Sequence, residues 1–240
     1  MQGGGPPPGA RDPDYSDGIS FPPNRDAHMH GDQRVGMLLI DRLEYVHGAD
    51  GHSGVLDGQA WYGGDLDKAT LKFEADASGG RVNDARVEAL WSHAVSAFWD
   101  TQLGVRHDGG TGPSREWAAF GVQGLAPYWF DVQATAYVGT SGRTAARLDV
   151  EYEVLLTQRL ILAPKFELNA YGKDDPDRGI GRGLSDASIG LRLRYEVRRR
   201  FAPYLGLTWS RRFGRSADLA RSRGESSSGH AWVAGVRVWW

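Results

Sequence analysis

Three consecutive residues near the start of the chain, His28, Met29 and His30, carry side chains that bind soft and intermediate metal ions. An imidazole accepts either oxidation state of copper, whereas a thioether favours Cu(I). The triplet lies in a glycine- and proline-rich segment, residues 1–33, where these side chains have no packing role. We therefore predict a copper-binding segment there. The alternative is that the triplet is a chance feature of a polar tail.

The sequence offers little for catalysis. Ser92 and His93 are adjacent, but neighbouring residues of a strand point to opposite faces, so they cannot act together as nucleophile and base. No phosphate-binding glycine loop and no His-Glu-x-x-His motif occurs. The absence of cysteine also removes thiolate zinc sites and cysteine nucleophiles. We predict that the protein is not an enzyme.

Polar and apolar side chains alternate with a period of two from Arg34 onward, which is typical of strands with one polar and one apolar face. Leu71 and Phe73, for example, alternate with Lys72 and Glu74. The longest apolar runs have four residues, far short of the roughly 20 that a membrane helix needs. The pattern predicts strands at 34–47, 55–63, 69–78, 82–93, 97–108, 115–124, 128–140, 143–156, 159–171, 184–197, 202–213 and 229–240.

The predicted connections alternate in character. Short ones fall around 65–68, 94–96, 125–127, 157–158 and 198–201. Mostly longer ones, rich in glycine, aspartate and serine, fall around 48–54, 109–114, 172–183 and 214–228. Bacterial outer-membrane barrels are built this way, with the short turns facing the periplasm.

The last segment alternates up to Trp240, and pairing it with the first would remove both sheet edges from hydrocarbon. We predict an all-β fold, a transmembrane antiparallel β-barrel of about twelve strands. It would occupy residues 34–240 in the outer membrane, preceded by a disordered, flexible periplasmic tail at 1–33.

Aromatic residues are expected to form two girdles, which mark the two interfaces of a membrane barrel. The predicted girdle at the short-turn end comprises Tyr62, Trp91, Trp99, Trp129, Tyr204 and Trp240. The predicted girdle at the other end comprises Tyr45, Tyr137, Trp209 and Trp232.

The polar strand faces would line the barrel interior with charges of both signs. The predicted lumen-lining residues are Arg42, Glu44, Glu74, Asp76, Arg86, Glu88, Asp100, Arg106, Asp149, Glu151, Glu153, Glu167, Arg192 and Arg194. One interpretation is that opposite charges pair across the barrel and fill it, because unpaired buried charges are costly. The other is a polar path for an ion or small solute, in which Asp149, Glu151 and Glu153 attract cations. Both can hold at once.

Several segments, taken in order, carry a specific pattern: Val35–Tyr45, Trp61–Asp65, Trp99–Arg106, Gly124–Phe130, Leu160–Glu167, Ser188–Glu196 and Phe201–Tyr204. Together they resemble the copper resistance protein B family over residues 30–240. The resemblance implies an outer-membrane protein of Gram-negative bacteria that acts in copper homeostasis and metal transport. Family members usually carry a long methionine- and histidine-rich N-terminal region, which is reduced here to His28, Met29 and His30.

On this resemblance we expect copper to be the bound ion or substrate, with outer-membrane lipid and a periplasmic multicopper oxidase as partners. The net charge of -2 argues against nucleic acid as a partner. Two alternatives remain. A specific solute channel like the twelve-stranded acidic-sugar porins should have an arginine-dominated lumen, and a barrel lipase should present serine and histidine on one lipid-facing surface.

Overall fold

A computed structural model of the chain describes residues 34–49 and 51–240. The predicted tail at 1–33, with His28, Met29 and His30, lies outside the described residues. Within the described ranges, no helix is long and apolar enough to cross a membrane.

Antiparallel strands make up most of the described chain. They are β1 (Val35–Gly48), β2 (Gly51–Gly63), β3 (Asp67–Ser78), β4 (Arg81–Ser96), β5 (Trp99–Gly110), β6 (Arg115–Ala126), β7 (Phe130–Gly139), β8 (Arg143–Glu151), β9 (Val154–Leu155), β10 (Leu160–Tyr171), β11 (Gly183–Tyr195), β12 (Phe201–Arg212) and β13 (Ser228–Trp239). The short helical segments are η1 (Pro127–Trp129), η2 (Thr140–Gly142), η3 (Pro176–Arg178) and α1 (Gly214–Ser222).

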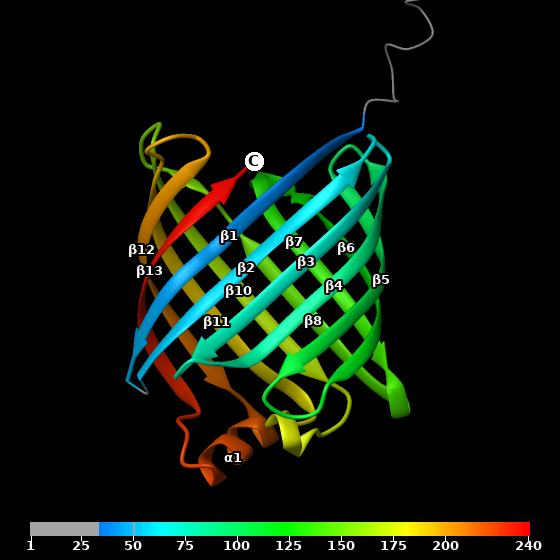
Figure 1. The fold of residues 1–240 in the computed structure, drawn as a ribbon, viewed down its shortest axis with the longest axis vertical. Helices are drawn as coiled ribbons and strands as arrows, with labels where there is room; N and C mark the ends of the chain where they lie inside the picture. The colour runs from blue at the N-terminus through cyan, green and yellow to red at the C-terminus, as the bar shows by residue number, and fades with distance from the viewer. Residues whose placement is uncertain (1–33, 50) are drawn as a thin grey trace, which may run out of the picture. The chain divides into compact units, whose positions relative to one another are not determined.

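The strands close into a barrel (Figure 1). Each strand pairs with the next one along the chain, except that β8 pairs with β10, and β13 pairs with β1 from Leu39↔Trp239 to Gly48↔Ala231. Because β8 and β9 both pair with β10, they share one position, which gives twelve positions in the described chain. The predicted fold class is therefore confirmed.

The connections 172–183 and 214–228 are long and lie at one end of the barrel, as predicted, but another predicted long loop is short. The segment 48–54, predicted to be a long loop, is instead a tight connection from Gly48 to Gly51, because pairing continues through His47↔His52. The segment 214–228, predicted to be a longer connection, contains α1, whose Ser216, Ala217 and Ala220 are buried. We call the end of the barrel that carries α1 and η3 the long-loop end, and the opposite end the short-turn end (Figure 1).

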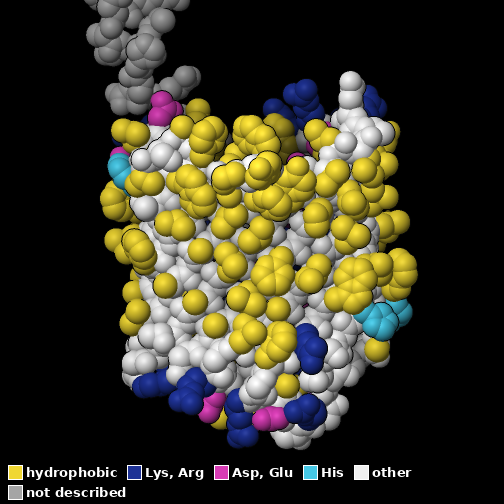
Figure 2. All heavy atoms as spheres, turned by 180° about the vertical axis from the view of Figure 1, so that it is seen from behind, with side chains coloured by type: hydrophobic (Ala, Val, Ile, Leu, Met, Phe, Trp, Pro, Cys, Tyr) yellow, Lys and Arg dark blue, Asp and Glu magenta, His cyan; other side chains and the backbone are white. Residues whose placement is uncertain are grey.

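The outer wall is apolar (Figure 2). Large side chains such as Leu103, Phe120 and Leu205 expose more than half of their surface. Lysine, arginine and acidic side chains gather at the lower edge of this band. A wall of this kind is stable when lipid covers it.

The predicted girdles were wrong at two positions, Tyr137 and Tyr204, which are 1% and 6% exposed and point inward. Each hydroxyl donates a hydrogen bond to a buried carboxylate, that of Glu88 or Glu44 respectively. Tyr204 also lies over Gly235, where a Cβ atom would be 2.7 Å from the tyrosine oxygen. The absence of a side chain at position 235 therefore leaves room for the inward-pointing Tyr204 ring.

Ile189 and Ser188 test the assignment of the two faces, because they are neighbours at the middle of β11 and only Ile189 is exposed on the outer wall. A lipid-facing arginine at mid-membrane costs about 2–4 kcal/mol in a barrel. Ile189→Arg should therefore lower the yield of heat-modifiable, folded protein in liposomes much more than Ser188→Arg. Equal yields would contradict the face assignment.

Candidate functional site

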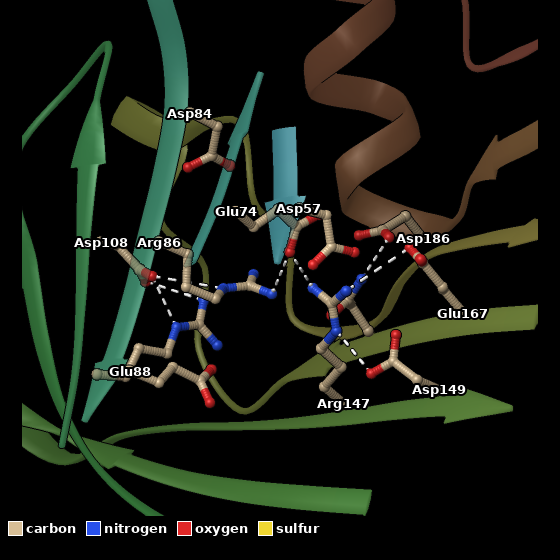
Figure 3. Close-up of polar contacts among 12 residues, drawn as sticks. Asp57, Glu74, Asp84, Arg86, Glu88, Asp108, Arg147, Asp149, Glu167 and Asp186 are labelled. Carbon is tan, nitrogen blue, oxygen red and sulfur yellow. Dashed lines mark hydrogen bonds and ion pairs between the residues drawn. The ribbon is translucent and has the colours of Figure 1, made fainter. Parts of the chain in front are cut away.

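A continuous ion-pair network crosses the barrel interior (Figure 3). At its centre, Arg147 from β8 lies 3.0 Å from Glu74 of β3, on the far side of the barrel. The same guanidinium lies 2.8 Å from Asp149 and 3.7 Å from Glu167. All of these side chains are largely buried, so each charge depends on its partners for compensation.

The network extends along the wall in both directions from Glu74. On one side, Arg86 lies 3.3 Å from Glu74 and 3.7 Å from Asp108. On the other, Arg42 lies 2.6 Å from Asp57 and 3.2 Å from Glu167. The outcome is a layer of alternating charges across the middle of the barrel.

Two further clusters flank this layer. Arg192 of β11 pairs with Glu44 of β1 at 2.5 Å, and Tyr204 donates to the same carboxylate at 3.0 Å. Nearer the short-turn end, Glu153 accepts from Arg194 at 2.5 Å and from Arg237 at 3.2 Å. These pairs join parts of the wall that are not neighbours in the sheet, with Glu153 lying between β8 and β9, so they tie the wall together from the inside.

The long-loop end is filled by side chains. Arg106 makes two hydrogen bonds with Asp108, which also accepts from the indole nitrogen of Trp117 at 2.8 Å. In the β10–β11 connection at the same end, Asp175 accepts two hydrogen bonds from Arg115. Ser216 of α1 accepts a hydrogen bond from the backbone N–H of Gly181. This connection and α1 are thus fastened over that end of the barrel.

The short-turn half contains a cavity of about 530 Å³. It reaches from Trp129 of η1, at the barrel end, to Glu74 and Arg86 in the central layer. We call this cavity the vestibule. Eight acidic residues and five basic ones line it, so carboxylates are in excess. Among the lining groups, one oxygen each of Glu88 and Asp149 is buried without a hydrogen-bond partner.

The predicted lumen-lining residues fall into three groups. Most take part in the contacts described above: Arg42, Glu44, Glu74, Arg86, Glu88, Arg106, Asp149, Glu153, Glu167, Arg192 and Arg194. Glu151 lines the vestibule. Asp76 and Asp100 lie nearer the two ends, where Asp76 accepts from Asn83 and Asp100 lies 3.7 Å from Lys68.

The sequence-based prediction missed Asp41, Asp57 and Asp108. Asp41 and Arg42 both face inward because a register irregularity follows Ile40 and interrupts the alternation. Asp57 lies in a segment with no regular polar pattern, and Asp108 is inside a strand that continues to Gly110. Of these three residues, only Asp108 continues the period-two alternation of its strand, so only its inward position could have been predicted from the sequence.

Ser92 and His93 do point to opposite sides. Ser92 is buried and lies 2.9 Å from the Thr70 hydroxyl, whereas His93 is partly exposed and lies 2.9 Å from Asp67. Across residues 34–49 and 51–240, no group of three or more histidine, cysteine, aspartate or glutamate side chains is arranged to hold a metal ion.

Known proteins with similar sequences identify the family of this chain. The family model for copper resistance protein B precursor matches residues 34–240. The chain belongs to the copper resistance protein B family. It is 46% identical over 213 residues to a copper resistance protein B homolog of Pseudomonas syringae pv. tomato, covering 88% of this chain and 72% of that protein. It is 43% identical over 217 residues to copper resistance protein B of Escherichia coli, covering 90% and 73%.

Solved structures show similarity of fold alone. The KdgM porin superposes with a TM-score of 0.54 at 12% identity, covering 85% of this chain and 98% of that chain. The NanC porin gives 0.56 at 13% identity, covering 82% and 98%. The described part of this chain thus shares the barrel fold of these two porins.

Removing one member of the central layer should be costly. Arg147→Leu leaves the buried Asp149 without its ion-pair partner and removes one of the partners of Glu74 and of Glu167, and we expect a loss of about 3–5 kcal/mol in the free energy of unfolding. Arg221→Leu is the control, because Arg221 pairs with Asp218 on the exposed surface of α1, where a pair contributes about 0–1 kcal/mol. The measurement is urea unfolding of the protein in lipid vesicles. Similar losses for both variants would contradict the role of the network.

Proposed function

We propose that this protein is an outer-membrane barrel that binds copper ions at its periplasmic side and passes them along its polar interior as part of copper resistance. The family assignment supports copper as the ion. The apolar wall and the short turns at one end support a barrel set in the outer membrane, with the short-turn end facing the periplasm. The proposal assigns no catalysis to the chain.

The observation that carries the proposal is the excess of carboxylates in the vestibule, eight against five basic groups. A cavity with this balance attracts cations and repels anions, especially where low-dielectric walls concentrate the field. It disfavours the alternative of a channel for acidic sugars, which would need a surplus of arginine.

Passage beyond the vestibule requires movement. The central layer and the Arg106–Asp108–Trp117 cluster fill the barrel between the vestibule and the long-loop end. A copper ion could displace a guanidinium from a carboxylate without leaving that acid uncompensated, because the cation replaces the positive charge. We therefore propose that ion pairs exchange partners as copper moves, with the long-loop end opening last.

The tail supplies selectivity in this scheme. His28, Met29 and His30 are softer ligands than the carboxylates of Glu151 and Glu153, so the tail should hold Cu(I) more selectively than the vestibule does. A periplasmic multicopper oxidase remains the predicted partner at that side, and it would receive or deliver the same ion.

Titration of Cu(I) into the full-length protein and a variant with all three tail residues changed to alanine tests the binding step. We expect weaker Cu(I) binding in the His28→Ala, Met29→Ala, His30→Ala variant, while folding is unchanged. Unaltered stoichiometry and affinity would exclude the tail as the site.

The passage step is tested in liposomes that contain the protein. Glu151→Gln together with Glu153→Gln should slow copper flux, because it removes two vestibule carboxylates. Flux of an acidic sugar that exceeds copper flux would instead favour the solute-channel alternative. Glu225→Gln, at an exposed ion pair outside the vestibule, is the control.

A further inference from the structure

Two histidines face each other across the β1–β2 hairpin at the long-loop end. His47 and His52 are cross-strand partners, and their Nδ1 atoms lie 2.9 Å apart. The two rings are inclined by 25°, with centroids 4.7 Å apart. Both side chains are exposed, on the outer wall rather than on the inner face that carries Arg42 and Glu44.

The Nδ1 atom of His52 has more hydrogen-bonding neighbours than one nitrogen can satisfy. Its Nδ1 atom is approached by His47 Nδ1 and also by the Tyr45 hydroxyl, at 2.6 Å. A neutral imidazole nitrogen offers either one N–H or one in-plane lone pair, so it cannot satisfy two such neighbours fully. At an exposed position each group could bond to water instead. The close approach of the two nitrogens therefore suits a ligand better than it suits a hydrogen-bonded pair.

The spacing of the two nitrogens indicates the geometry of that ligand. With metal–nitrogen bonds of about 2.0–2.1 Å, two nitrogens 2.9 Å apart subtend an angle of about 90° at the ion. That angle fits neighbouring ligands in a tetragonal site, which Cu(II) and Ni(II) prefer, and is too small for the tetrahedral arrangement preferred by Zn²⁺.

We infer that His47 and His52 form a second metal site, which takes a tetragonal divalent ion, Cu(II) above all, on the outer wall of the barrel. Both histidines bind in their neutral form through Nδ1, and water completes the coordination. Binding frees the Tyr45 hydroxyl from His52. Because the site faces away from the interior, it is not a stage on the proposed copper path, and it stands whether or not that path exists.

The test uses the full-length protein in detergent, with His28→Ala, Met29→Ala and His30→Ala introduced so that the tail does not compete. Cu(II) is added below one equivalent, and electron paramagnetic resonance reports the number of coordinated nitrogens. We expect a tetragonal signal with two imidazole nitrogens. His47→Ala and His52→Ala should each weaken Cu(II) binding by at least about tenfold, since loss of even an outer-shell partner typically costs 10–100-fold.

His107→Ala is the matched control. His107 is an exposed histidine near the long-loop end of β5, but its Nδ1 contacts Glu116 at 2.5 Å instead of a second imidazole. It should leave the signal and the affinity unchanged. Heat-modifiable migration on gels verifies that every variant is folded. A signal from one nitrogen or none, or affinity that survives His47→Ala and His52→Ala, would overturn the site.

Discussion

Many of the buried charges in this barrel are compensated by opposite charges from other strands. Arg147 is surrounded by three carboxylates, and its partner Glu74 is 73 residues away in the sequence. Such a pair forms only when the wall is curved and the strands are in register. The ion pairs therefore require the closed sheet. They also favour one strand register, since a slip of one residue in the pairing of a strand would turn its buried charges toward lipid.

The two halves of the barrel interior differ in how completely their charges are paired. At the long-loop end, aromatic rings and paired charges fill the space, with the Arg106 guanidinium 4.4 Å from the centre of the Tyr137 ring. At the short-turn end the pairing is incomplete, which leaves both a cavity and a surplus of acids. An ion would thus meet a solvated, negative entrance on one side and a dry, balanced packing on the other.

Period-two alternation was enough to predict the strands and their closure, because a wall between lipid and a polar interior imposes that pattern on every segment. It failed where a side chain's role is not decided by hydrophobicity. Tyr137 and Tyr204 look like interfacial aromatics in the sequence, yet their hydroxyls are needed by buried carboxylates. The irregularity after Ile40 and the partners of each charge depend on pairing between distant segments, which one sequence does not reveal. Helix α1 forms because the barrel buries one of its faces.

The seam between β1 and β13 sets the order of events during assembly. Leu38 and Trp240 exchange two backbone hydrogen bonds, so the pairing of β1 is completed only when Trp240 is in place. Contacts at such sequence separation make folding slow, because a very long loop must close before they contribute. Until then β1 presents an open edge that can recruit other extended chains. The time between synthesis and closure is therefore the period in which this protein most needs a chaperone.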